Sequence, residues 1–353
     1  MERKLGLVGI MDLYAERRYR KHPSFLDDVD QLLNWSRIEN KLKKKLRRSE
    51  ENCAGAKAYP ALCMFKVLLL QSWYGLSDLD MEMALYDRYS FCRFVGITMD
   101  DDVPDHTTIC RFRNILAEKK CLQKLLDEVN QQLSAKGKLV RSGCVVDATI
   151  ISSSSHPHKQ VDIETVAIDR EEEDTDTCRV SVSYSKDIEA GWTRKGSHYY
   201  YGYKGHMAVD SVNGFVLNGH VTPANYSDTK ELKRLVSSAC LPERARVYAD
   251  KGFCSQANRD ELRVQKLKNG IMDKATRGHP LSERQKQRNR LISSVRGIVE
   301  RGFGTLKRCY GQHRAKYLGV LKVESAFLLA ALAFNLKKAI SLPVKKKAIL
   351  SFT

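Results

Sequence analysis

Three acidic residues that are far apart in the sequence have surroundings that suggest chemistry. Asp147 lies inside the β-branched run "CVVDATI", and Asp250 ends the short apolar run "RVYAD". A charge in a buried strand is costly unless it is paired or bound to a metal ion. Acids at the carboxyl ends of strands in an open α/β sheet also lie where such sheets place their sites. For either acid alone, the alternative is a strand-end residue that caps the next turn.

The third acid, Glu300, lies in the basic stretch "VRGIVERGFGTLKR". Arg296 precedes it by four positions and Lys307 follows it by seven, so the three side chains share one face of a helix. The two cations could hold the phosphates of a nucleic-acid strand whose scissile bond lies beside the carboxylate. The alternative is an exposed ion pair worth about 0.3–0.5 kcal/mol.

If the three acidic side chains lie close together in the fold, their chemistry indicates the type of reaction. Two carboxylates ~4 Å apart repel by roughly 4 kcal/mol at an effective dielectric constant of 20, so the cluster would need a counter-ion. Oxygen ligands suit Mg²⁺ or Mn²⁺, and two such ions promote in-line displacement at phosphorus. The arrangement therefore predicts metal-dependent phosphodiester chemistry with two bound ions.

Composition favours a nucleic-acid partner. The 353 residues carry a formal net charge of +18, with a pI near 9.4, and 42% are hydrophobic. This length allows two domains, and this charge attracts a polyanion. The apolar runs are too short or too interrupted for the ~20 residues of a membrane-spanning helix, and no lipidation motif is present. We therefore expect no membrane partner and a cytoplasmic, nucleoid-associated protein with reduced cysteines.

Residues 1–136 are predicted to form an all-helical N-terminal domain that binds DNA. Helical spacing starts behind Ser24, which is in a capping position with Asp27, and it ends in a basic run. Residues 58–74 form a buried helix, Ser77 caps the next helix, and another helix starts behind Asp105. This last helix carries Arg111 and Arg113, and the short helices before it resemble a helix-turn-helix arrangement, in which basic side chains meet DNA. A plain helical bundle with solvated arginines is the alternative.

The sequence pattern changes near residue 137 from helical spacing to short β-branched runs. Residues 137–345 are predicted to form a mixed-sheet α/β domain, and residues 346–353 a short tail. The predicted order is a strand, a hairpin around Asn213 and Gly214, a helix, further short strands and a long basic helix over 283–308. Residues 151–198 are polar and read as an exposed insertion, which contains the acidic run "REEEDTDT".

Two smaller patterns accompany these elements. His156 and His158 form H-x-H, for which a loose loop is the alternative to a metal site. Asp228 and Glu231 are spaced as a capping box of the helix that follows the hairpin.

The fragments "VVDATI" and "VYADKGF", followed by Arg296, three residues, Glu300, six residues and Lys307, resemble the DDE transposases of the insertion-sequence-five group. Further fragments extend the resemblance over most of the chain, among them "PDHTTICRFRN", "YYYGYKGHMAVD" and "YLGVLKVESAFLLAALAFNLKK". Their fixed order makes the resemblance specific.

The resemblance implies an RNase H-like catalytic domain in which Asp147, Asp250 and Glu300 bind the metal ions. It also implies that Arg296 and Lys307 contact DNA near the cut. Two positions depart from the family pattern: Ser293 stands where the family has tyrosine, and Ser227 where it usually has histidine. Both departures bear on DNA positioning and leave the metal ligands in place.

Other side chains are secondary candidates for DNA binding. Lys204 and His206 could face phosphates, although a solvated hairpin edge is the alternative. Trp192 could stack on an unpaired base, with ordinary packing as the alternative. Asn225 and Asp228 are most simply turn and cap residues.

These observations predict a transposase that binds the inverted-repeat ends of an insertion sequence, cuts with water and joins the freed 3′-hydroxyls to target DNA. Two ends must be processed together, so a homodimer or larger synaptic assembly is expected. One alternative is a DNA-binding protein without catalysis, which a cleavage assay on repeat-bearing oligonucleotides would reveal. Another is a cellular nuclease of the same fold, which RNA/DNA hybrid or junction substrates would reveal.

Overall fold

The computed structural model describes residues 3, 5, 9–19, 21, 24–46, 57–155, 157, 160–166, 177–183 and 186–342. His156, His158, the acidic run and the tail 346–353 lie outside these residues. Within them, no helix has the length and apolarity needed to cross a membrane.

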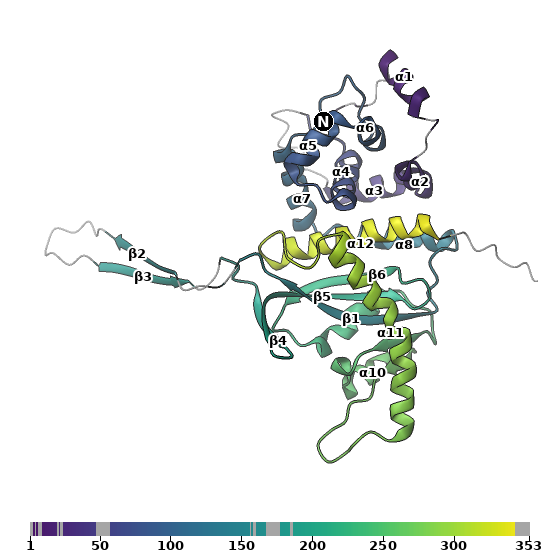
Figure 1. Cartoon of the computed structure of the whole chain (residues 1–353), viewed down its shortest axis with the longest axis vertical. Helices are drawn as coiled ribbons and strands as arrows, with labels where there is room; N and C mark the ends of the chain where they lie inside the picture. Colours follow the sequence, from purple (N-terminus) through teal and green to yellow (C-terminus); the bar gives the residue numbers. More distant parts are fainter. Residues whose placement is uncertain are drawn as a thin grey trace, which may run out of the picture.

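The N-terminal part of the chain is helical, as predicted (Figure 1). Its elements are α1 (Ile10–Tyr19), α2 (Phe25–Leu32), α3 (Trp35–Leu46), α4 (Ala61–Tyr74), α5 (Asp78–Asp87), α6 (Tyr89–Val95), α7 (His106–Glu118) and α8 (Leu122–Ala135). Local capping signals fix several starts. Ser24 and Asp27 form a capping box at α2, and Asp105 caps α7.

The helical pattern behind Ser24 is divided into two helices, where one was predicted. Leu33 is extended, and the backbone N–H of Asn34 donates to Gln132 Oε1 at 2.7 Å. Gln132 Nε2 in turn donates to the carbonyl of Asn34 at 3.2 Å. A side chain about one hundred positions away thus replaces the helical hydrogen bonds of this backbone, which the local pattern could not reveal.

The second half of the chain forms a mixed sheet. Its strands are β1 (Gly143–Ser152), β4 (Gly191–Lys195), β5 (His198–Asp210), β6 (Val216–Pro223), β7 (Arg246–Ala249) and β8 (Lys268–Ile271). The order is β4-β5-β1-β7-β8, and β6 also pairs with β5. β1 is antiparallel to β5 and parallel to β7, which is parallel to β8. The hairpin predicted around Asn213 and Gly214 is confirmed by the β5–β6 pair.

Strand β5 comes unusually close to β1 at Gly202. This glycine has a φ of +154°, and an added Cβ would lie 2.3 Å from the carbonyl oxygen of Ile151. A side chain at this position would push the two strands apart, so the pairing requires glycine here.

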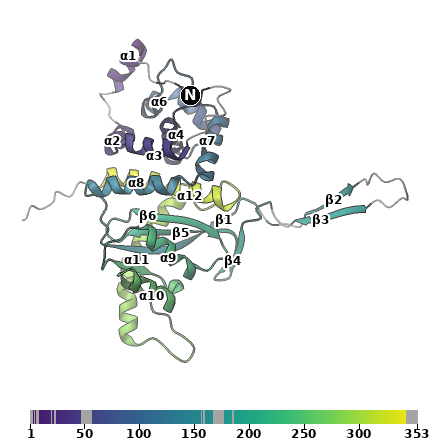
Figure 2. The same cartoon turned by 180° about the vertical axis from the view of Figure 1, so that it is seen from behind.

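Helices cover both faces of the sheet. These are α9 (Leu232–Ser238), α10 (Gln256–Val264), α11 (Glu283–Cys309) and α12 (Val320–Ser341), with 3₁₀ turns η1 (Asp228–Glu231) and η2 (Lys251–Phe253). The opposite views in Figures 1 and 2 place α11 in front of one face and α9 in front of the other. The long basic helix predicted over 283–308 is confirmed by α11.

α12 joins the helical part to the sheet. It packs against β6 on one side and against α8 and α4 on the other (Figure 1). Asn335 of α12 is fully buried and donates to Asn130 Oδ1 and to the Val216 carbonyl, at 2.9 and 2.8 Å. The two regions therefore share one core across the boundary that the sequence pattern places near residue 137.

The polar segment 151–198 contains more regular structure than predicted. Its first residues still belong to β1, and its end forms β4 of the main sheet. Between them, β2 (Gln160–Val166) and β3 (Thr177–Ser183) pair as a separate two-stranded ribbon that projects from the body (Figure 2). Only part of the segment is therefore an insertion into the sheet.

Candidate active site

A cavity of about 700 Å³ lies where β1, β7 and α11 meet, and all three predicted acids line it. Asp147 comes from β1, Asp250 follows β7, and Glu300 comes from α11. The strand register explains the first two. Val146 pairs with Ala249 across the parallel strands, so Asp147 and Asp250 are the next residues of neighbouring strands.

Asp147 is the most enclosed of the acids. Its side chain is 18% exposed, and its carboxylate accepts a hydrogen bond from the Ala148 backbone N–H at 2.9 Å. Burial raises the pKa of Asp147, Arg296 opposes that rise, and the negative charge of Asp250 adds to it. The ionised form of Asp147 therefore needs a positive charge beside it.

Arg296 provides that charge in this conformation. Its guanidinium lies 2.9 Å from Asp147 Oδ2 and 3.3 Å from Asp250 Oδ1, and its side chain is 11% exposed. Its Nε has no hydrogen-bond partner within the described part of the chain. Asp250 also accepts from the Lys251 backbone N–H at 2.6 Å, so it caps η2 as well as lining the cavity.

Glu300 is exposed on the same cavity and has no ion pair or hydrogen bond among the described side chains. Within the described ranges, no three histidine, cysteine or acidic side chains are gathered closely enough to hold a metal ion. The three acids share a cavity, and Arg296 joins two of them.

Basic side chains from three elements complete the cavity. They are Arg194, Lys195, Lys204, Arg296 and Lys307. Burial, followed by the charge of Lys195, lowers the pKa of Lys307. The lining therefore carries five cations and four acids, Asp228 being the fourth, and this positive excess suits a polyanionic ligand.

The predicted capping box of Asp228 and Glu231 is wrong. The Asp228 carboxylate pairs with Lys204 Nζ at 3.0 Å and lines the cavity, while Glu231 lies 2.7 Å from His220 Nε2. Ser227 is the N-cap of η1, and its side chain makes no capping hydrogen bond. Both side chains thus bind partners from distant segments and make no capping hydrogen bond at the start of the helix. The local sequence offered no signal for the contact of Asp228 with Lys204, because Asp228 lies in η1 and Lys204 lies on β5.

Two of the predicted DNA-binding residues are engaged inside the protein. His206 is fully buried, hydrogen-bonded to Thr222 Oγ1 at 2.9 Å and stacked on His220, so its side chain does not face phosphates. Arg113 is 11% exposed, forms an ion pair with Asp78 and lies over the ring of Tyr317. Both side chains satisfy partners within the core, and we remove them from the DNA-binding set.

Three other candidates keep accessible surface. Arg111 is exposed on α7, and Trp192 on β4 is 53% exposed beside Tyr201. Lys204 lines the cavity but also donates to the Tyr226 carbonyl at 2.8 Å.

The sequence was compared with known families. Residues 138–336, more than half of the chain, match the family described as "Transposase DDE domain". The chain belongs to the DDE transposase family. Residues 13–114 match "Transposase domain (DUF772)". The mixed sheet with helices on both faces is the RNase H-like α/β fold expected for this transposase, preceded by a helical region.

A relative of the transposase agrees with this assignment. The "Transposase for insertion sequence element IS1106" of Neisseria meningitidis serogroup B is 41% identical over 231 residues, which are 65% of this chain and 76% of that protein.

Two solved structures show only weak likeness. The piggyBac transposase synaptic complex with hairpin DNA is 13% identical, with a TM-score of 0.43 over 94% of this chain and 79% of that chain. The Mos1 transposase paired-end complex is 11% identical, with a TM-score of 0.22 over 77% and 83%. These scores carry no argument, and the family rests on the sequence matches.

DDE transposase domains generally depend on divalent metal ions, and the donors in the cavity fit such ions. Asp147, Asp250 and Glu300 offer only oxygen atoms, which Mg²⁺ and Mn²⁺ prefer. Two of these acids are strand neighbours that already share the positive charge of Arg296. These oxygen donors therefore match in kind the divalent ions on which the domain family generally depends.

Proposed function

We propose that this transposase binds the inverted-repeat ends of its insertion sequence, cleaves them and transfers the freed strands into target DNA. The observation that supports this best is the single cavity lined by Asp147, Asp250 and Glu300 and edged with cations. Enzyme class and family are already given by the sequence matches. The proposal adds the residues, the substrate and the two steps.

Both steps exchange one phosphodiester oxygen for another. In the first, water attacks the phosphorus at the end of the element, the P–O bond to the 3′ oxygen breaks, and a 3′-hydroxyl is released. In the second, that hydroxyl attacks a phosphodiester of the target, and the displaced target strand leaves with a free 3′-hydroxyl. One cavity can serve both steps because the attacking group changes while the phosphorus chemistry does not.

The three acids would hold two divalent ions, Mg²⁺ or Mn²⁺. When bound, such ions activate the attacking oxygen and stabilise the leaving oxygen. Lys307, from the same helix as Glu300, would hold a phosphate beside the scissile bond. Arg296 would hold the phosphate on the other side once the metal ions have replaced it as the partner of Asp147 and Asp250. Lys204 of β5 would contact the strand from the cavity wall, and Trp192, exposed on β4 outside the cavity lining, would stack on an unpaired base.

We further propose that residues 1–136 act as the DNA-binding domain, with Arg111 available to phosphates, and that residues 137–345 act as the catalytic domain. Two element ends have to be cut together, so the active form would be a dimer or a larger synaptic assembly on duplex DNA.

The test is Asp147→Asn, which keeps the size of the side chain and removes its charge. We expect binding to a duplex that carries the inverted repeat to stay within about twofold, and Mg²⁺-dependent nicking to fall at least about 10³-fold. Asp260→Asn is a matched control because Asp260 is 50% exposed on α10 and does not line the cavity. Nicking by Asp147→Asn at the wild-type rate would reject the site.

Substrate choice tests the competing nuclease function. Wild-type cleavage of RNA/DNA hybrids or branched junctions in preference to repeat-bearing duplexes would replace the proposed substrate.

A further inference from the structure

One residue in the lining of the cavity has no side chain. Gly304 lies on α11 about one turn after Glu300 and one turn before Lys307, and all three line the cavity. It is exposed, whereas Gly302 of the same helix is buried. The surface of α11 between the acid and the lysine is therefore bare helix backbone.

Helix formation does not explain a glycine at this position. In the interior of a helix only proline is less favourable than glycine, because glycine loses the most backbone freedom on folding. The backbone of Gly304 is helical and lacks the positive φ that would require glycine. An alanine here would therefore favour the helix without straining the backbone.

Packing inside the protein does not require glycine here either. Apart from the adjoining helix backbone and the two chain neighbours, no atom of the described residues lies within 4 Å of a Cβ built on Gly304. Gly302 differs, because its added Cβ would lie 3.3 Å from Met207 Cε of the sheet. A side chain on Gly304 would therefore extend into the cavity and nothing else.

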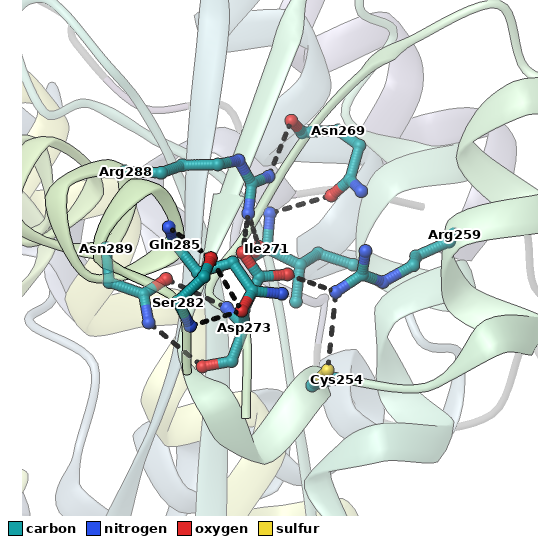
Figure 3. Close-up of polar contacts among 9 residues, drawn as sticks. All are labelled: Cys254, Arg259, Asn269, Ile271, Asp273, Ser282, Gln285, Arg288 and Asn289. Atoms are coloured by element: carbon teal, nitrogen blue, oxygen red, sulfur yellow. Dashed lines mark hydrogen bonds and ion pairs between the residues drawn. The ribbon is translucent and has the colours of Figure 1, made fainter. Parts of the chain in front are cut away.

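The helix that carries this glycine is held firmly against the sheet. At its start, the Asp273 carboxylate accepts hydrogen bonds from Arg259 at 2.6 Å and from Arg288 of α11 at 2.8 Å (Figure 3). Asn289 of α11 accepts from the Asp273 backbone N–H at 2.9 Å and donates to its carbonyl at 3.0 Å. Near the glycine, Leu306 is buried in the core. A new side chain between these anchors would displace a ligand in the cavity, because the helix is fixed.

We propose that Gly304 is a positioning residue of the cleavage reaction, because its missing side chain lets the cut DNA strand lie directly against α11. This inference rests on the proposed function, in which Glu300 helps to hold the metal ions at the scissile phosphate and Lys307 holds a phosphate beside it. The deoxyribose between these two phosphates would lie over Gly304. A side chain there would push this sugar away and move the scissile phosphate out of line with the attacking oxygen.

The test compares Gly304→Ala with Gly297→Ala, a matched control on the same helix. Gly297 lies outside the cavity lining, and its added Cβ would make only an ordinary contact, 3.6 Å from Arg301 Nη1. Both variants replace a helical glycine by the best helix former, so both should raise the Tm by about 1–3 °C. Without divalent metal, both should bind the repeat-bearing duplex within about twofold of wild type.

The two variants should differ in the chemical step. A displacement of about 1 Å can slow a reaction about 10²-fold, so Mg²⁺-dependent single-turnover nicking should fall about ten- to hundredfold in Gly304→Ala. Gly297→Ala should nick within about twofold of wild type. Gly304→Leu keeps a good helix former and enlarges the side chain, so its loss should be at least as large. The rise in Tm on adding MgCl₂ should be the same in Gly304→Ala and wild type, because the three acids are unchanged.

Nicking by Gly304→Ala at the wild-type rate would overturn the inference, as would an equal loss of nicking in Gly297→Ala. A lower Tm in Gly304→Ala would also overturn it, since the glycine would then serve the fold, and so would a smaller response of the Tm to MgCl₂. If the wild type does not nick the repeat-bearing duplex, the proposed function fails and this inference with it. If the wild type nicks and Gly304→Ala keeps that rate, only the role of Gly304 is rejected.

Discussion

Replacing Arg296 by glutamine should destabilise the metal-free protein and make its stability more dependent on divalent ions. The guanidinium contacts Asp147 at 2.9 Å and Asp250 at 3.3 Å, and glutamine can satisfy neither charge. The change leaves two neighbouring carboxylates without their shared counter-charge.

The size of the effect follows from the exposure of each partner. The side chain of Asp250 is 44% exposed, so its contact with Arg296 contributes at most about 1 kcal/mol. Asp147 is 18% exposed, and a hydrogen bond to a charged group in such a place contributes about 1.5–3 kcal/mol. We therefore expect Arg296→Gln to lower the free energy of unfolding by about 2–3 kcal/mol at pH 7.

Magnesium should offset this loss. A ligand that binds only the folded state at a hundredfold excess over its Kd stabilises by about 2.7 kcal/mol. The gain should be larger in Arg296→Gln than in wild type, since in wild type the ion competes with the guanidinium for the same carboxylates.

The measurement is urea denaturation followed by tryptophan fluorescence, with and without MgCl₂. Arg290→Gln, on the exposed side of the same helix, is the matched control and should stay within about 0.5 kcal/mol of wild type. A loss below 0.5 kcal/mol, or an equal magnesium effect in variant and wild type, would refute the account of Arg296 as the counter-charge of the two acids.

Three further predictions concern the fold. Burial lowers the pKa of His206 to about 4 from its ordinary 6.5, so the folded state binds fewer protons than the unfolded state between these values. The contribution of His206 should therefore cost nothing above pH 6.5 and up to roughly 3 kcal/mol towards pH 4. Burial also lowers the pKa of His220, which is stacked on His206, so His206→Leu should flatten the pH dependence in urea titrations without abolishing it. Burial raises the pKa of Asp273, but the bonds from Arg259 and the charge of Arg288 outweigh it and the net pKa is lowered. Asp273→Asn should cost about 2 kcal/mol at pH 7, and calorimetry should show the difference from wild type shrinking as acid protonates Asp273 below its ordinary pKa. Gly202→Ala should cost more than about 3 kcal/mol or prevent folding, because its Cβ would meet a backbone oxygen of β1; a soluble variant with wild-type Tm would contradict the close approach of β1 and β5.

Interactions within a few residues were readable from the sequence. The capping boxes of α2 and α5, the Asp105 cap of α7 and the β5–β6 hairpin join neighbours along the chain, and all are present. The helical period placed Arg296, Glu300 and Lys307 on one face of α11, and all three line the cavity. The groups involved are neighbours along the chain, so these features could be predicted without knowledge of the packing.

Contacts between distant segments were decided only by the tertiary structure. Arg296 meets an acid 149 positions away, and that pairing follows from the way α11 lies against β1 and β7. Other contacts between distant segments bury His206, pair Arg113 with Asp78, and place Asp228 beside Lys204 in place of a helix cap. The sequence by itself thus identified the side chains that could take part in catalysis, because residue type and helical or strand period can be read from the order of the residues. Which of them meet depended on strand register and helix packing, because these are set by burial of the whole core.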